Sequence, residues 1–206
     1  MDFFRLAFFF LKKAHLFAAS FRIWAPRLWE HYNDTIKRLE GCPGTSRNFD
    51  SSVFPCACLN LGCTVCCFHR DPRNLPYGWN PVTVFGPFDH REGGHIVLED
   101  FNLMIQAPHG TSYAIMGACV SHGNAPLADP VREHRSSFTQ YMPGGLRRWL
   151  DNGGATDKYL RENDPVEFKR VQAWKSGNWE RGVGMLSTLD EVMEWLGHPV
   201  DKDQAV

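Results

Sequence analysis

Short apolar segments separated by turn residues fill the middle of this chain, and they constrain the fold more than any other feature. Turn signals such as Gly93-Gly94 and Pro108-His109-Gly110 interrupt the block that runs over residues 53–141. Many short strands with such punctuation are typical of a β-sandwich or a barrel-like roll. We therefore predict strands at 53–60, 63–69, 80–86, 94–98, 101–106, 112–118 and 135–141.

Helical periodicity appears on both sides of this block. Pro26 suits the first turn of a helix over residues 25–39. Residues 165–180 have helical character, and Thr188 with Glu191 forms a capping-box pattern before a final apolar stripe. The expected fold class is therefore α+β, with a β core and flanking N- and C-terminal helices.

The first twenty residues are rich in phenylalanine but predict no membrane partner. Their longest apolar run covers residues 6–11, far short of the roughly 20 residues that span a bilayer. We expect an amphipathic or docking helix here, or else a poorly ordered extension. The predicted organisation is an extension at 1–20, a single domain at 21–200 and a tail at 201–206. Within the domain, the β core takes residues 53–141 and the C-terminal helices take residues 145–197.

The composition is that of an ordinary globular protein. The hydrophobic share is 43%, the charged share is 22% and the formal net charge is −1. This balance excludes a strongly basic nucleic-acid binder. Any contact with nucleic acid would have to come from local clusters such as Arg132, His134 and Arg135, or Arg147 and Arg148.

Six of the seven cysteines lie before residue 68, and two interpretations are open for them. The run Cys56-x-Cys58-x4-Cys63-x2-Cys66-Cys67 could hold zinc, although it lacks the second, separated ligand pair of zinc modules. We favour small buried residues on two adjacent strands, because free cysteine packs as a small hydrophobe. Unpaired thiols predict a reduced, intracellular setting.

A candidate metal site begins at His69-Arg70-Asp71. Residues two apart on a strand point the same way, so His69 and Asp71 can reach one ion. His122 follows later on the same β scaffold. Two histidines and one carboxylate form the facial triad of non-haem Fe(II) oxygenases, which leaves coordination positions open.

The last predicted strand, at 135–141, has one polar face. By the same alternation, Arg135, Ser137, Thr139 and Tyr141 share this face. The guanidinium of Arg135 can hold the distal carboxylate of 2-oxoglutarate through two parallel hydrogen bonds.

These motifs together resemble those of a known family. His69-Arg70-Asp71-Pro72-Arg73-Asn74 resembles the His-Arg-Asp-x-x-Asn signature of the TET/JBP dioxygenases, which oxidise 5-methylcytosine or thymine in nucleic acid. The later motifs, at residues 93–98, 122–126 and 135–141, follow in the order found in the fungal, transposon-associated branch. The resemblance extends over residues 21–196.

The resemblance implies a fold, a cofactor set and a cellular location. The core would be a double-stranded β-helix, a jelly-roll or cupin-like architecture. His69, Asp71 and His122 would be the catalytic ligands of Fe(II). Arg135, helped by Ser137, would bind the cosubstrate 2-oxoglutarate, and O2 would be consumed. A role in DNA demethylation would place the protein in the nucleus.

The same resemblance implies the substrate. Asn74 and Tyr141 match family residues that lie near the target base, so the expected substrate is a methylated nucleobase, similar to 5-methylcytosine, in nucleic acid, with DNA preferred to RNA. Animal members have Gln-His after this tyrosine, whereas this chain has Met142-Pro143. The alternative function is a catalytically degenerate β-helix domain of transposon origin that binds nucleic acid or protein.

Another departure from the family concerns one strand. Asn80-Pro81 stands where a cysteine and a small residue are expected. Proline donates no ladder hydrogen bond, so we expect this strand to begin late or to lie at a sheet edge.

Overall fold

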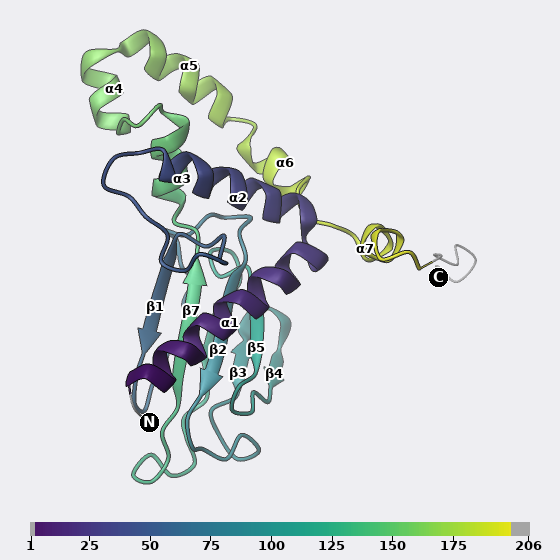
Figure 1. The fold of residues 1–206 in the computed structure, drawn as a ribbon. Coiled ribbons are helices and arrows are strands. Elements are labelled where there is room, and N and C mark those ends of the chain that lie inside the picture. Colours follow the sequence, from purple (N-terminus) through teal and green to yellow (C-terminus); the bar gives the residue numbers. More distant parts are fainter. Residues whose placement is uncertain (1–2, 199–206) are drawn as a thin grey trace.

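Two antiparallel sheets with helices at both ends of the chain form the fold (Figure 1). The computed structural model describes residues 3–198. The four-stranded sheet has the order β1-β7-β2-β5, and the three-stranded sheet has the order β4-β3-β6. The strands are β1 (Cys56–Asn60), β2 (Asn80–Phe85), β3 (Ile96–Leu98), β4 (Leu103–Ile105), β5 (Ser112–Ile115), β6 (His122–Asn124) and β7 (Ser136–Tyr141). The predicted α+β class is confirmed.

The segment at 63–69 completes the roll without being a strand. Predicted as continuous, it forms only isolated bridges, from Cys63 to Arg135 and from His69 to His122. The second bridge sets the segment beside β6, so the smaller sheet gains a fourth, irregular member. Two four-membered layers of this kind are the jelly-roll arrangement expected of a double-stranded β-helix. Each of the other six predicted segments contains a shorter strand, while β6 had no prediction of its own.

The expectation for Pro81 is wrong. Strand β2 begins at Asn80 and lies inside the larger sheet, between β7 and β5. The proline is tolerated because Asn80 and Pro81 pair only with β5, whereas pairing with β7 starts at Val82. The missing donor of Pro81 therefore interrupts no bond to β7.

Two N-terminal helices cover the larger sheet. Helix α1 (Phe3–Trp24) crosses β7 and β2 in Figure 1 and is followed by α2 (Pro26–Glu40). Phe10 and Ala14 of α1 pack against Phe85 and Phe138 of the sheet. Nearer the other end of α1, a larger aromatic core joins both helices to the sheet, with members Phe21, Leu28, Tyr32, Phe54, Leu75 and Met142. The N-terminal segment thus forms the helix that we favoured.

Between β7 and residue 198 the structure has five helices: α3 (Gly144–Asp151), α4 (Asp157–Asn163), α5 (Pro165–Lys175), α6 (Asn178–Val183) and α7 (Leu189–Trp195). The helix predicted at 165–180 is two helices, α5 and α6. The predicted capping box of Thr188 and Glu191 at the start of α7 is confirmed. No helix among residues 3–198 is long and apolar enough to cross a membrane. The predicted domain boundaries stay predictions.

Candidate metal centre and adjoining cavity

The structure brings His69, Asp71 and His122 together. One ligand atom from each residue lies within 4.8 Å of the others. The His69 Nε2 atom is 3.7 Å from Asp71 Oδ1, and the His122 Nε2 atom is 3.9 Å from Asp71 Oδ2. Ligand atoms about 2.1 Å from a shared ion at right angles are roughly 3 Å apart. Small side-chain rotations would therefore close the set around a metal.

Backbone pairing places the two histidines side by side. His69 and His122 exchange both of their backbone N–H···O hydrogen bonds, each 3.0 Å long. Their ring centroids are 4.4 Å apart. Asp71 follows directly, and its N–H donates to Gly117 O at 2.8 Å. Local backbone hydrogen bonding thus fixes the positions from which all three side chains converge.

The ring orientation of both histidines suits metal binding. The Nδ1 atom of His69 lies 2.9 Å from Cys67 O, and that of His122 lies 2.8 Å from Val120 O. A carbonyl oxygen only accepts, so each Nδ1 carries the proton and donates it. Each Nε2 is then left with a lone pair that faces Asp71, which is the tautomer a metal ligand requires.

Two asparagines hold the carboxylate of Asp71. Asn74 Nδ2 and Asn80 Nδ2 both donate to Asp71 Oδ2, each at 3.2 Å. Asn80 is almost fully buried. Within residues 9–198, whose side chains the structure describes, Asp71 pairs with no lysine or arginine. Amide donors orient a carboxylate without neutralising it, so its charge stays available to a cation.

Asn80 was missed as a site residue, because its residue type and its neighbours in the sequence do not indicate a site. Asn80 and Val82 are two apart in β2, and both line the cavity that contains the triad. Gly117 completes the fit, because a Cβ there would lie 2.5 Å from Asn80 Nδ2 and 2.8 Å from Asp71 Oδ2. The position therefore accepts only glycine without displacing these two side chains.

A cavity of about 550 Å³ extends from the triad to the polar face of β7. The predicted face is confirmed, since Arg135, Ser137, Thr139 and Tyr141 all line it. Asn74 lines it as well. The opposite face of β7 is turned away from the cavity and is covered by other parts of the chain. Phe138 packs against α1, and Gln140 accepts a hydrogen bond from Ser52. The structure thus brings every predicted site residue to one cavity.

Arg135 is a buried cation in this cavity. Its side chain is only 3% exposed, and its Nε donates to Gly94 O at 3.0 Å. Gly94 has a φ of +67°, and a Cβ there would lie 3.0 Å from Arg135 Cδ. No carboxylate in residues 3–198 forms an ion pair with Arg135. A buried guanidinium without an anionic partner is costly, and an anion bound beside it would offset that cost.

Tyr113 and Ser137 flank Arg135. Burial raises the pKa of Tyr113 to about 12, although the charge of Arg135 and a hydrogen bond with it act in the opposite direction. The tyrosine is therefore a neutral hydroxyl at neutral pH. The Ser137 hydroxyl accepts a hydrogen bond from Asn60 Nδ2 at 3.1 Å, and it lines the same cavity as Arg135. Neutral hydroxyl groups around one cation favour binding of a carboxylate.

Tyr141 lies near the end of the cavity that holds the triad. Burial raises its pKa, and the neighbouring Cys56, Cys58 and Asp71 raise it further. The ring is thus a neutral, partly exposed aromatic surface. The next residue, Met142, is fully buried in the aromatic core, and Pro143 lines the cavity. The Met142-Pro143 departure therefore leaves no imidazole at the position of the animal family's histidine.

The cysteines are not the buried residues that we favoured. Cys63 and Cys67 are exposed because the segment at 63–69 is irregular and lies on the surface, and Cys58 is exposed on β1, which is an edge strand of the larger sheet. The zinc alternative gains no support either. The only metal-ligating cluster within residues 3–198 is that of His69, Asp71 and His122. Cys58 and Cys66 line the cavity without joining it.

Comparison with known proteins gives a limited likeness of fold. No family model matches the chain, and no curated protein does. Among solved structures, NgTET1 in complex with 5mC DNA is 17% identical with a TM-score of 0.44, covering 54% of this chain and 42% of that chain. An RmlC-like cupin protein from Desulfovibrio desulfuricans is 13% identical with a TM-score of 0.27, covering 48% and 92%. The chain thus matches less than half the length of NgTET1.

Proposed function

We propose that this protein is an Fe(II)/2-oxoglutarate-dependent dioxygenase that oxidises a methylated nucleobase, similar to 5-methylcytosine, in nucleic acid. One observation carries the proposal. A two-histidine, one-carboxylate cluster and a buried arginine without an acidic partner line the same cavity. The cluster fits a cation, and the arginine fits an anion. A dioxygenase of this class needs both at one site.

The cluster fits Fe(II) by its donor set. Two imidazoles and one carboxylate with open positions are the ligand set of non-haem iron oxygenases. His69, Asp71 and His122 would hold the ion through two Nε2 atoms and one carboxylate oxygen. Asn74 and Asn80 would keep the carboxylate in place through their hydrogen bonds to Oδ2.

Arg135 would bind the distal carboxylate of 2-oxoglutarate. Its Nε is occupied by Gly94 O, which leaves the terminal nitrogens to form paired hydrogen bonds with the ligand. The Ser137 hydroxyl would add a further contact. Because Arg135 and the triad line one cavity, a single 2-oxoglutarate molecule would contact both.

Bound iron, with 2-oxoglutarate and O2, supplies oxidation of a C–H bond: the methyl group becomes hydroxymethyl while 2-oxoglutarate becomes succinate and CO2. The chain's own contribution is placement. Tyr141 would pack against the target base, and the Asn74 amide would contact its edge. A base in a duplex must be flipped out of the stack to reach such a cavity, whereas a single strand presents it at lower cost.

Anaerobic titration tests the metal and cosubstrate first. Fe(II) and 2-oxoglutarate together should give a metal-to-ligand charge-transfer band. The H69A variant should abolish it, while H15A, at an exposed position on α1, should retain it. A folded protein that gives no band would overturn the proposal.

Mass spectrometry of methylated oligonucleotides then tests the substrate. Incubation with Fe(II), 2-oxoglutarate, O2 and ascorbate should yield an oxidised base and succinate in equal amounts. Tight oligonucleotide binding without succinate from DNA or RNA would instead support the alternative of a degenerate binding module. The nuclear location stays a prediction in either case.

A further inference from the structure

A second and larger cavity, of about 760 Å³, adjoins the candidate site. Arg73, Asn74 and Pro143 line both cavities. The rest of its lining comes from the segment at 72–77, from helix α3, which follows β7, and from the end of α5 and the start of α6. We call it the helical cleft. A ligand that leaves the candidate site past Asn74 would enter the helical cleft directly.

The helical cleft is basic. Arg73, Arg147, Arg148 and Lys175 line it, against the single carboxylate of Asp151. The lining of the cleft is therefore positively charged, whereas the whole chain has a formal net charge of −1. A concave surface with an excess of one charge concentrates ligands of the opposite sign.

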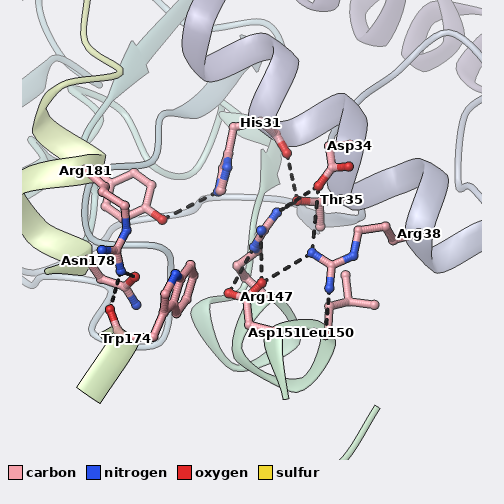
Figure 2. Close-up of polar contacts among 11 residues, drawn as sticks. His31, Asp34, Thr35, Arg38, Arg147, Leu150, Asp151, Trp174, Asn178 and Arg181 are labelled. Atoms are coloured by element: carbon pink, nitrogen blue, oxygen red, sulfur yellow. Dashed lines mark hydrogen bonds and ion pairs between the residues drawn. The ribbon is translucent and has the colours of Figure 1, made fainter. Parts of the chain in front are cut away.

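Arg147 belongs to the frame of the cleft and is not free to bind a ligand. Its guanidinium contacts Asp151 Oδ1 at 2.9 Å and donates to Thr35 Oγ1 at 2.8 Å, as Figure 2 shows. His31 lies in the same network. Burial, and then the charge of Arg147, lower the pKa of His31 to about 4. The histidine is therefore neutral at neutral pH, and this network joins α2 firmly to α3.

The other three cations have charge to spare. Arg148 and Lys175 share one carboxylate, that of Asp157, at 3.4 and 2.8 Å. Burial alone would raise the pKa of Asp157, but hydrogen bonds from Lys175 and Asn152 and the charges of Lys175 and Arg148 lower it. Arg73 forms no ion pair with any residue of the described chain and lies where the two cavities meet. The cleft thus has a surplus of positive charge that begins beside the triad.

An aromatic side chain lies among these charges. Trp179 lines the helical cleft and is 52% exposed. Its neighbour Trp174 is already covered by Arg181, whose guanidinium carbon is 4.3 Å from the ring centroid. Basic grooves that also present an open aromatic ring bind single-stranded nucleic acid, through phosphate contacts and base stacking.

We propose that the helical cleft binds the phosphodiester strand that flanks the target base. Arg73 would contact the phosphate next to that base, Arg148 and Lys175 would contact later phosphates, and a neighbouring base would stack on Trp179. This inference rests on the proposed function, because it places the strand that carries the proposed substrate. It turns the Arg147-Arg148 cluster of the sequence into part of a defined site, to which the comparisons assign no role.

Oligonucleotide binding to the metal-free protein tests this without turnover. The probe is a fluorescein-labelled single strand of ten nucleotides, as DNA and as RNA, measured by anisotropy from low to moderate salt. R148Q should weaken binding and reduce the slope of log K against log salt by about 0.7, the value for one lost phosphate contact. R170Q is the matched control, because Arg170 also pairs with one carboxylate, that of Glu167 at 2.5 Å, but lies outside the cleft.

The W179A variant tests the stacking contact. It should weaken binding about fivefold or more, the lower end for loss of one stacked base. Its salt slope should stay unchanged because no charge is lost. W195A is the control, since Trp195 is also exposed but lies on α7, outside the cleft.

The outcomes separate this proposal from the proposed function. Unchanged binding by both R148Q and W179A would overturn the cleft, even if the protein oxidises methylated bases. Weakened binding by both would support the cleft, even if no succinate forms. Equal competition by an acidic peptide of the same charge would overturn it as a nucleic-acid site. A difference between the DNA and RNA arms would identify the preferred strand.

Discussion

The two sheets of this protein differ in how they are packed. In the larger sheet, β2 and β7 are buried along almost their whole length, and α1 covers the outer face (Figure 1). In the smaller sheet, β4 is exposed at every residue. They also supply different halves of the candidate site. Ser137 and Tyr141 belong to the larger sheet and Arg135 directly precedes its strand β7, whereas His122 belongs to the smaller sheet and His69 is bridged to it.

This difference separates two tasks. The anion-binding half rests on a packed framework, while the metal-binding half rests on a three-residue strand and an irregular segment. The metal-binding half is therefore held by backbone hydrogen bonds and by amide contacts to Asp71 more than by core packing. Substitutions in the two halves should have separable effects.

The largest effect is expected on stability. F138A removes a ring that is 3% exposed and lies 5.0 Å from Phe10 between centroids, so it should cost about 3–5 kcal/mol of unfolding free energy. F101A, which removes a ring that is 59% exposed next to β4, should cost no more than about 0.5 kcal/mol. Urea denaturation measures both. Equal losses would show that the smaller sheet is packed as tightly as the larger one.

An intermediate effect is expected on cosubstrate binding. R135M removes a buried charge but keeps much of the side-chain volume, so the affinity for 2-oxoglutarate should fall about 100-fold, equivalent to about 3 kcal/mol. The affinity for Fe(II) should change little, because Arg135 contacts none of the three triad residues. Anaerobic calorimetric titration measures both ligands. A parallel loss of iron binding would show that the two halves are one unit.

The smallest effect is expected on metal affinity. N80A removes one of the two amide donors to Asp71 and should weaken Fe(II) binding about 10- to 100-fold, as loss of a ligand's supporting hydrogen bond typically does. N60A is the matched control, because Asn60 donates to Ser137 and should affect 2-oxoglutarate instead. Fe(II) titration with a competing chelator distinguishes them. Unchanged iron affinity in N80A would contradict a positioning role for this amide.

Local rules in the sequence predicted much of the fold. The capping box at Thr188 and the alternating face of β7 follow from residues within one element, and both are as expected. Strand β6 was missed because His122-Gly123-Asn124 shows no alternation of apolar residues. Its strand character comes from pairing with β3, which is distant in the sequence. The segment at 63–69 was wrongly predicted as a strand, since its apolar residues lie on the surface instead of in a sheet.

The candidate site was predictable where residue type alone signals chemistry. Histidines, a carboxylate and an arginine in order indicate a metal and an anion, and the structure places them in one cavity. Asn80 and Gly117 carry no such signal. Their importance comes from distance, because each lies against Asp71 only after β2 and the turn following β5 come together. Of the helical cleft, the sequence showed only the Arg147-Arg148 pair, since its basic residues come from three separate segments.

The reciprocal backbone pair between His69 and His122 has a consequence for dynamics. This pair joins the irregular segment to the smaller sheet, and the same two residues are the proposed ligands. An ion bound by both side chains would keep these two backbone hydrogen bonds closed. Local opening of the fold at this pair would then require release of the metal. Amide exchange at these two positions would then slow on loading, while exchange in β2 and β7 would stay as it was. The metal would thus stabilise the contact between the smaller sheet and the irregular segment at 63–69, which is the less tightly packed part of the fold.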